Sequence, residues 1–183
     1  MTCGEIDFKC TRCRLSRGRT QVVPGVGRCD SPIAFLGEAP GRDEDLKGEP
    51  FVGRGGKILD QALKEAGISR SQVFICNLVK CRPPKNRRPR KDEIETCSMF
   101  LRSELGTVRP SVVCVLGQTA ANSILHNKLS MSDLICRNWT TEIGERKMKV
   151  VVAYHPAACL YQKRNLGAFK ESIRASLESA GML

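Results

Sequence analysis

The sequence predicts an α/β domain in which helices form layers on both faces of a parallel sheet. Three observations support this fold class: short β-branched apolar runs recur along the chain, amphipathic segments separate them, and no shift in composition marks a domain boundary. Uninterrupted apolar runs are typical of strands buried on both faces, and their alternation with helices favours a three-layer α/β/α architecture. The 183 residues are enough for one such domain, which we place over residues 1–183.

Four apolar runs are the predicted strands, at residues 33–37, 73–77, 112–117 and 149–154. Four segments between or after them have helical spacing, at residues 57–66, 91–105, 118–126 and 166–180. Gly67 follows the first helix and Pro89 precedes the second, as expected of residues that mark helix boundaries. No apolar run reaches the roughly 20 residues that a transmembrane helix needs, so we expect no membrane partner.

Basic residues outnumber acidic ones, with 30 Lys and Arg against 19 Asp and Glu and a net charge of +11. An excess of this size favours a polyanionic partner, most simply nucleic acid, although a merely basic protein would show it too. Much of the charge lies in two segments: Arg12, Arg14, Arg17 and Arg19, and then Lys80, Arg82, Lys85, Arg87, Arg88, Arg90 and Lys91.

Four of the ten cysteines are candidates for a metal site: Cys10, Cys13, Cys81 and Cys97. The first two form a C-x-x-C pair, which cannot complete a tetrahedral site alone and needs two more soft ligands. Four thiolates from two separated segments suit zinc or an iron–sulfur cluster, and spacing alone leaves that choice open. The competing interpretation is that all four are buried cysteines that pack as small hydrophobes.

The other six cysteines are expected to be mainly structural thiols, although Cys3 could replace Cys10 as a ligand. The N-terminal residues lack the apolar core of a signal peptide. We therefore expect a reducing cytoplasm, with the protein associated with nucleoid DNA, rather than a compartment that forms disulfides. The six are Cys3, Cys29, Cys76, Cys114, Cys136 and Cys159.

Each predicted strand runs into a segment with chemically active side chains. Glu38 follows the first strand, Asn77 ends the second, and His155 follows the fourth. Ligands of open α/β sheets bind at the carboxyl ends of the strands, so we expect these side chains to share one crevice. Singly, they would be read as a capping acid, a turn residue and an ordinary histidine, but their convergence favours a functional site.

Four motifs, GEAPG, GEPFVGRGGK, NLVKCRPP and YHPA, occur in an order that resembles the uracil-DNA glycosylase superfamily. The four-cysteine set is similar to its iron–sulfur branch, family 4, and the resemblance covers about residues 8–180. The resemblance implies a four-stranded parallel sheet, a [4Fe–4S] cluster on Cys10, Cys13, Cys81 and Cys97, and a monomer. It also implies excision of uracil from single- or double-stranded DNA, and identifies no replication-clamp partner.

The chemistry of this reaction assigns roles to the residues of the crevice. His155 is suited to donate a hydrogen bond to uracil O2, where the departing base carries negative charge. Glu38 is suited to orient water and to stabilise the cationic sugar. The amide of Asn77 can accept from uracil N3–H and donate to O4, a pattern that cytosine reverses. Phe51 offers a ring on which the base can stack.

The resemblance also places Glu44 near the base, where it would limit access at C5, and Gly37 and Ala39 complete the expected uracil-binding set. Ala39 stands where the best-known branch of the superfamily has an aspartate, which places more of the reaction on Glu38. A covalently trapping branch carries a histidine after NxxKCRPP, but residues 83–93 contain none, so we expect hydrolysis without a covalent intermediate.

Residues expected to contact DNA lie in three segments of the chain. Leu160 or Tyr161 could wedge into the base stack where the uracil leaves, and the glycine-rich residues 53–57 would set a helix and contact phosphate. The latter do not match a Walker A loop, because no Ser or Thr follows Lys57 at the right spacing. The expected phosphate contacts are Lys85, Arg87, Arg88, Lys163 and Arg164.

Two other function classes remain open. A non-catalytic nucleic-acid-binding module could use zinc or a cluster only to hold its basic loops, but it leaves Glu38, Asn77 and His155 without a shared purpose. An electron-transfer protein would favour a neutral or acidic shell, whereas Lys and Arg surround these cysteines. We therefore expect an enzyme.

Overall fold

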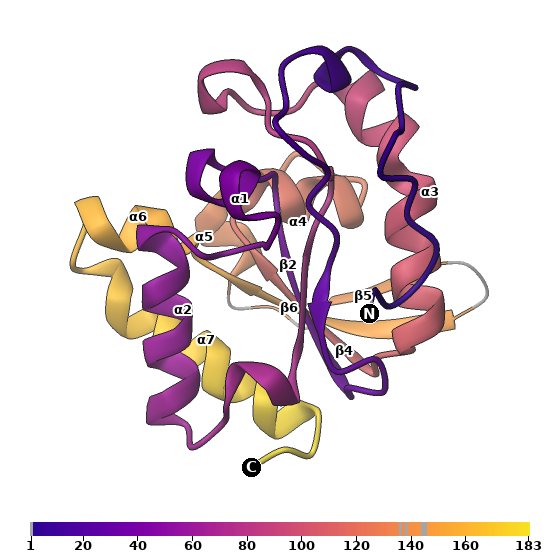
Figure 1. Ribbon diagram of the computed structural model, residues 1–183. Helices are drawn as coiled ribbons and strands as arrows, with labels where there is room; N and C mark the ends of the chain where they lie inside the picture. Colours follow the sequence, from indigo (N-terminus) through magenta and orange to yellow (C-terminus); the bar gives the residue numbers. More distant parts are fainter. Residues whose placement is uncertain (1, 136, 138, 144–145) are drawn as a thin grey trace.

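A six-stranded sheet runs through the computed structural model, which describes residues 2–135, 137, 139–143 and 146–183 (Figure 1). The strands lie in the order β1-β3-β2-β4-β6-β5, and the predicted α/β class is confirmed. Their bounds are β1 (Val26–Gly27), β2 (Ile33–Gly37), β3 (Phe74–Asn77), β4 (Val112–Leu116), β5 (Trp139–Ile143) and β6 (Arg146–Ala153).

The centre of the sheet is parallel and its edges are antiparallel. Strands β3, β2, β4 and β6 pair in parallel, and every residue of β2, β3 and β4 is buried. The expectation of four strands is wrong at the edges, where β1 and β5 pair antiparallel with β3 and β6. Strand β1 has only two residues, and β5 alternates in burial, so neither has the continuous apolar run that marks a central strand.

The four predicted helices are present, with shifted ends. The helix predicted to start at residue 57 begins at Arg54, and the one predicted to reach residue 126 ends at Ile124, because His126 has a φ of 52° that a helix cannot accommodate. The α-helices are α1 (Arg42–Lys47), α2 (Arg54–Glu65), α3 (Lys91–Val108), α4 (Gln118–Ile124), α5 (Met131–Leu134), α6 (Pro156–Tyr161) and α7 (Asn165–Ser179). Short 3-10 turns occur at Arg14–Arg17, Arg70–Gln72 and Pro84–Asn86.

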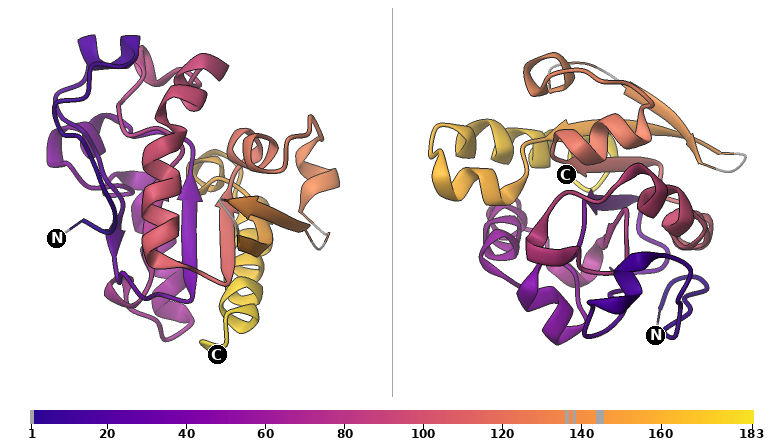
Figure 2. Two further views of the ribbon diagram at one scale, coloured as in Figure 1. Left: turned by 90° about the vertical axis from the view of Figure 1, so that its right-hand side faces the viewer. Right: turned by 90° about the horizontal axis from the view of Figure 1, so that it is seen from above.

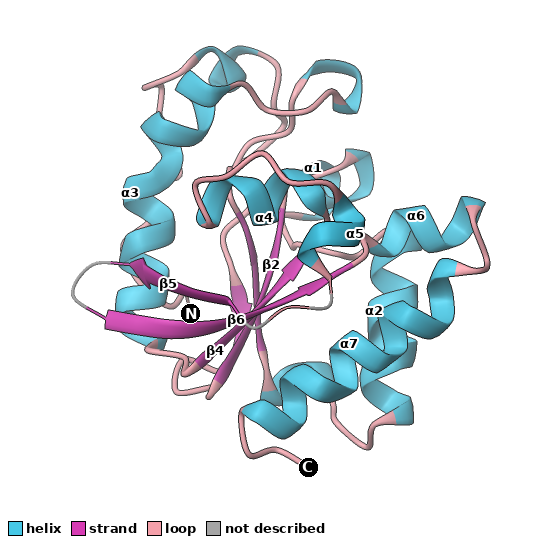
Figure 3. Cartoon of the chain, turned by 180° about the vertical axis from the view of Figure 1, so that it is seen from behind, coloured by secondary structure: helices cyan, strands magenta, loops and turns pink. Residues whose placement is uncertain are grey.

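Successive strand residues point into two cores on opposite faces of the sheet. Ala34 and Leu36 of β2 pack with α3 and α4, whereas Ile33 and Phe35 pack with α2 and α7. Figures 2 and 3 show these two pairs of helices on opposite faces of the sheet. This two-residue period lets one strand serve both faces, which explains why the central strands are apolar throughout. Within the described ranges, no helix is long and apolar enough to cross a membrane.

The N-terminal segment lies beside α3 in both views of the chain (Figures 1 and 2). The backbone N–H of Glu5 donates to Ser103 Oγ over 2.7 Å, and a disulfide joins Cys3 to Cys29, with Cα atoms 5.3 Å apart. The expectation that these two cysteines are free thiols is therefore wrong, and Cys3 is no longer a candidate ligand. The disulfide could not be predicted, because Cys3 and Cys29 are 26 residues apart in the sequence and meet only when the N-terminal segment folds back beside β1 at the edge of the sheet.

Three of the remaining structural cysteines are buried free thiols, as predicted: Cys76, Cys114 and Cys159. Burial raises the pKa of Cys76 and of Cys114 to about 12, so both stay protonated at neutral pH. Cys136 lies outside the described residues.

Candidate active site

A cavity of about 420 Å³ lies where β2, β3 and β6 end. Glu38 follows β2, Asn77 is the last residue of β3, and His155 is the N-cap of α6 just after β6. All three line the cavity, together with six other residues singled out from the sequence: Ala39, Glu44, Phe51, Arg87, Leu160 and Tyr161. The parallel strands thus bring a carboxylate, an amide and an imidazole into one crevice.

Asn77 presents an unpaired acceptor in this crevice. Its side chain is buried, and Oδ1 has no hydrogen-bond partner among the described residues. Gly37 pairs with Asn77 across the sheet, and a Cβ at Gly37 would lie 2.4 Å from that Oδ1. Buried acceptors without partners are rare and costly, so an unpaired amide oxygen here is poised for a donor on a ligand.

Phe51 is held in a strained backbone conformation beside this amide. Its φ is 54°, and its carbonyl accepts from Arg70 Nη1 over 3.2 Å, while Arg70 Nη2 bonds to the carbonyl of Pro50. A Cβ at Gly56 would lie 1.8 Å from the Phe51 carbonyl oxygen, so only glycine permits this approach. The ring centroid of Phe51 is 6.0 Å from that of His155, with the ring planes tilted by 33°.

The tautomer of His155 follows from its hydrogen bond at the start of α6. Nδ1 accepts from the backbone N–H of Ala157 over 3.2 Å. Burial lowers the pKa of His155, against the charge of Glu44, so the imidazole is neutral at neutral pH. Since Nδ1 is an acceptor, the proton of the neutral ring lies on Nε2, which makes Nε2 a hydrogen-bond donor.

Glu38 is a partly desolvated carboxyl group. Burial raises its pKa, while a hydrogen bond from the Thr119 hydroxyl and the charge of Arg88 act in the opposite direction. Its backbone carbonyl accepts from Val79 N–H over 3.3 Å, which ties the turn after β2 to the turn after β3. The backbone of Glu38 is therefore fixed between two turns, while Thr119 and Arg88 act on its carboxyl group.

Glu44 uses both carboxylate oxygens to join two loops of the crevice. Oε1 accepts from the backbone N–H groups of Val52 and Gly53 over 3.0 and 2.9 Å, and Oε2 accepts from Gly41 N–H over 3.1 Å. The loop after β2 is thereby fixed to the loop that carries Phe51. Glu44 lines the cavity, but its oxygens are occupied by backbone donors.

Lys80 differs from the other basic residues of its segment, because it is buried. Only 1% of its side chain is exposed, and Nζ lies 2.5 Å from Glu104 Oε2 and 2.8 Å from the carbonyl oxygen of Asn77. Burial is the largest single influence and disfavours the charged form. The charge and hydrogen bond of Glu104, with smaller contributions from Cys76 and Cys97, together outweigh it, so the pKa of Lys80 is raised. Glu104 also accepts from Gly25 N–H over 2.6 Å.

The residues expected to contact DNA differ in their exposure and in whether they already pair with a carboxylate. Arg87 lines the cavity and makes two hydrogen bonds to the buried carboxylate of Glu93, over 2.6 and 2.8 Å. Tyr161 and Leu160 are 78% and 38% exposed at the edge of the crevice. The other predicted phosphate contacts are exposed: Lys85, Arg88, Lys163 and Arg164.

The four candidate metal ligands gather in one small core around Leu15 and Phe100: Cys10, Cys13, Cys81 and Cys97. Two N–H groups point at their sulfurs: the backbone of Lys80 donates to Cys97 Sγ over 3.3 Å, and Arg19 Nη1 donates to Cys81 Sγ over 3.4 Å. Burial raises the pKa of Cys81 to about 11. Among the described residues, no three His, Cys, Asp or Glu side chains are grouped tightly enough to hold a single metal ion.

Sequence reasoning did not find three residues that shape the site. Arg70 and Glu104 lie far along the chain from the backbone groups that they hold, and Thr119 is an ordinary helix residue in sequence. An arginine or a glutamate in a helical or polar segment carries no signal of the distant carbonyl or N–H group to which it bonds.

Comparisons with known proteins agree with the motifs. A family model described as the uracil DNA glycosylase superfamily matches residues 24–178. The chain is 45% identical over 159 residues to a type-4 uracil-DNA glycosylase of Archaeoglobus fulgidus, covering 85% of this chain and 80% of that protein. Type-4 enzymes of Saccharolobus solfataricus and Thermotoga maritima are each 41% identical, over 93% and 86% of this chain and 82% and 81% of their own lengths.

Replacing Lys80 with methionine should strongly destabilise the fold, because it leaves the buried Glu104 carboxylate without its counter-charge. Breaking one side of a buried ion pair typically costs about 3–5 kcal/mol of unfolding free energy. Denaturant unfolding followed by circular dichroism would measure the loss. The double variant Lys80→Met and Glu104→Leu should lose less than Lys80→Met alone, and a Lys80→Met midpoint equal to wild type would contradict this role for the pair.

Proposed function

The chain belongs to the uracil DNA glycosylase superfamily, and we propose that it hydrolyses the N-glycosidic bond of uracil in DNA and leaves an abasic site. Uracil in DNA arises by deamination of cytosine, so this activity is a repair activity. The observation that carries the proposal is the unpaired Asn77 Oδ1 in a cavity that also holds a neutral His155 and a carboxyl group. The substrate is uracil-containing DNA, and the similarity to type-4 enzymes supports the iron–sulfur branch.

Recognition of the base depends on the fixed orientation of one amide. Asn77 Oδ1 would accept from uracil N3–H, which satisfies the unpaired acceptor, and Nδ2 would donate to O4. Cytosine has an acceptor at N3 and an amino group at C4, so it would leave both amide groups of Asn77 mismatched. Phe51 and Gly37 flank the amide, and we assign the base to the space beside the Phe51 ring.

Cleavage requires that two charges of opposite sign be stabilised, a negative charge on the base and a positive charge on the sugar. As the bond breaks, the base becomes negative, and Nε2–H of His155 is the donor that we assign to uracil O2. The sugar becomes positive, and the Glu38 carboxylate would stabilise it and align the attacking water. The product is then an abasic site without a covalent enzyme intermediate.

The four gathered cysteines supply the thiolates that a [4Fe–4S] cluster needs, and the similarity to type-4 enzymes favours a cluster over a zinc ion. A cluster places each thiolate on a different iron, so its ligands stand farther apart than the four ligands of one ion. The shared core of the four cysteines can supply one thiolate for each iron. The N–H groups of Lys80 and Arg19 that point at sulfur are donors of the kind that stabilise cluster thiolates. We assign the cluster a structural role, in joining the N-terminal segment to α3.

Contact with DNA would come from loops around the crevice. Lys85, Arg88, Lys163 and Arg164 are exposed and suit phosphate binding, and Leu160 or Tyr161 suits the wedge that fills the space left by the base. Arg87 is different, because its guanidinium is already paired with Glu93. We therefore assign Arg87 to holding the loop at the crevice rather than to a free phosphate contact.

Loss of either catalytic residue should slow cleavage without abolishing DNA binding. Removing one preorganised donor typically lowers the rate by roughly a hundredfold to a thousandfold, so His155→Ala and Glu38→Ala should show losses of that order in single-turnover assays.

The DNA product of the wild-type enzyme should be nicked only after heating in alkali. A U·G pair or single-stranded uracil should react faster than U·A, since flipping the base costs less there. Wild-type rates in both variants would remove the two central residues from this mechanism.

The rate should also fall at acidic pH, because the proposed mechanism requires an ionised Glu38 and a neutral His155. Burial raises the pKa of Glu38, so the carboxylate is lost as the pH falls through a value above that of an ordinary glutamate. A pH profile of the single-turnover rate would show this limb in the wild type. Glu38→Gln should be slower at every pH, and its rate should not show the fall at acidic pH that protonation of Glu38 causes in the wild type.

Exchange of Asn77 for aspartate should lower uracil excision and weaken the rejection of cytosine. A protonated carboxyl can donate to cytosine N3 and accept from its amino group, which the asparagine amide held in the uracil-reading orientation cannot do. Excision from matched oligonucleotides with uracil or cytosine at one position would give both rates. Asn165→Asp is the matched control, because Asn165 is buried outside the crevice. Unchanged selectivity in Asn77→Asp would refute the assigned pocket.

Loss of one cluster ligand should remove the cofactor. Cys81→Ala should lower the iron content, bleach the brown absorption of the purified protein and reduce its thermal stability. Cys159→Ala is the control, because Cys159 is a buried free thiol outside the cysteine core. Full iron content in Cys81→Ala would show that the assignment is wrong, whatever its activity.

A further inference from the structure

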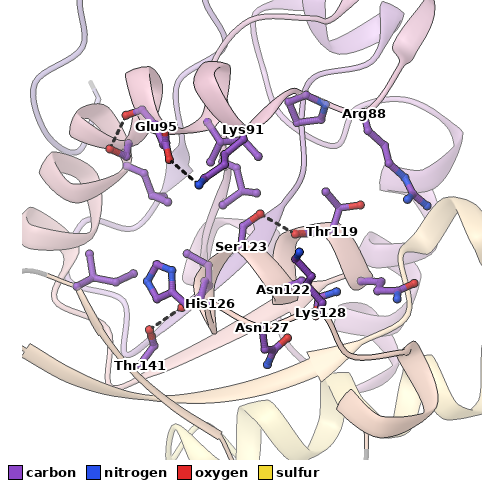
Figure 4. A pocket seen from close by; sticks show the side chains of 18 of the residues that line it. Arg88, Lys91, Glu95, Thr119, Asn122, Ser123, His126, Asn127, Lys128 and Thr141 are labelled. Atoms are coloured by element: carbon purple, nitrogen blue, oxygen red, sulfur yellow. Dashed lines mark hydrogen bonds and ion pairs between the residues drawn. The ribbon is translucent and has the colours of Figure 1, made fainter.

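A second and larger cavity lies next to the crevice. It is a groove of about 1390 Å³ between α3, α4 and β5, whereas pockets for small ligands usually have about 300–1,000 Å³ (Figure 4). Lys91 and Glu95 of α3 form one wall, and Asn122 and Ser123 of α4 lie across from them. A groove of this size suits a segment of polymer better than a single small molecule.

The rim of the groove is positively charged. Arg88, Lys91, Arg102 and Lys128 line it, against two acids, Glu95 and Glu142. Lys91 is 3.6 Å from Glu95, but none of the ion pairs between described residues involves Arg88, Arg102 or Lys128. Since these three cations pair with no carboxylate of the described residues, they are available for an anionic ligand.

The groove has a floor of buried apolar side chains, of which Leu78 and Leu101 are the most buried. Leu78, Leu101, Ile124 and Ile143 supply apolar surface. Four polar side chains also line the groove: Gln118, Asn122, Ser123 and Asn127. Unpaired nucleotides present the complementary arrangement, with apolar base faces on one side and phosphates on the other.

The groove reaches the catalytic carboxyl group at one end. Thr119 and Arg88 both line the groove, and both act on Glu38, through the threonine hydroxyl and the arginine charge. Leu78, on the groove floor, directly follows Asn77 of the crevice. A strand with its base in the crevice would therefore have one flank directed into the groove.

We propose that this groove binds the unpaired nucleotides that flank the uracil on one side of the substrate strand. The proposal rests on the proposed function of the crevice and extends it to a subsite for single-stranded DNA. A duplex flank does not suit the groove, because paired bases cannot turn their faces to its apolar floor.

The test compares a charge-reversed groove with a matched control. Arg102→Glu and Lys128→Glu reverse two groove cations that lie outside the crevice. The control reverses Lys64 and Arg174, which lie on α2 and α7 over the opposite face of the sheet. Substrates are a uracil trinucleotide, long single strands with uracil near the 5′ or the 3′ end, and a duplex. Binding constants are measured with a fluorinated, uncleavable uridine analogue across a salt series.

The wild type should bind one of the two long single strands more tightly than the other, and far more tightly than the trinucleotide. The groove variant should lose roughly tenfold in affinity for that strand, and its salt dependence should weaken by about 1.4 in the slope of log K against log salt, for two phosphate contacts. Excision from the trinucleotide should be unchanged, and the control should behave as the wild type.

Two results would overturn the groove assignment while the proposed function stands. One is an equal loss of affinity of the groove variant for the duplex and for both single strands, which would show that the charge reversal weakens DNA binding non-specifically. The other is wild-type affinity of the groove variant for both long strands. Failure of the proposed function would look different, because uracil would then be released from none of the substrates.

Discussion

The buried ion pair between Lys80 and Glu104 is the interaction on which the two functional regions of the molecule depend. Lys80 Nζ holds the carbonyl of Asn77 at the base crevice, while its backbone N–H donates to Cys97 in the cysteine core. Its carbonyl accepts from Val23 N–H over 2.7 Å, and Glu104 accepts from Gly25 N–H, so the N-terminal segment is tied to the same pair. Burying two charges is costly. Here the cost is offset by the attraction between the two charges and by their hydrogen bonds to the backbone groups of Asn77 and Gly25.

A second constraint is the strained loop that carries Phe51. A non-glycine residue at positive φ costs of order 1–3 kcal/mol and persists only where its surroundings over-determine it. Here Arg70 binds the carbonyls of Pro50 and Phe51, and Glu44 holds the N–H of Val52. The loop is therefore fixed from both sides, so the aromatic ring is positioned before any ligand arrives and little ordering entropy is lost on binding.

The parts that sequence predicts well are those that follow from chain periodicity. The central strands and the three crevice residues Glu38, Asn77 and His155 could be placed because apolar runs give the strands and parallel strands end at one edge. The edge strands β1 and β5 could not, since one is too short and the other is half exposed. The burial of Lys80 could not be predicted, because the sequence does not reveal a charged partner such as Glu104, which lies 24 residues further along the chain. The Cys3–Cys29 disulfide was missed for the same reason.

Burial shifts the pKa values of both His155 and Glu38 toward the neutral form, but the two groups differ in what surrounds them. Burial makes a charged His155 expensive, so its Nε2–H acts as a neutral donor, which is sufficient because uracil leaves as a stabilised anion. Burial also disfavours the charge of Glu38, yet Thr119 and Arg88 favour the carboxylate from outside the crevice. The negative group can then stand on the side of the cationic sugar, with the neutral donor on the side of the base. In a site of low effective dielectric, this arrangement favours charge separation along the breaking bond, and no proton needs to be transferred to the base.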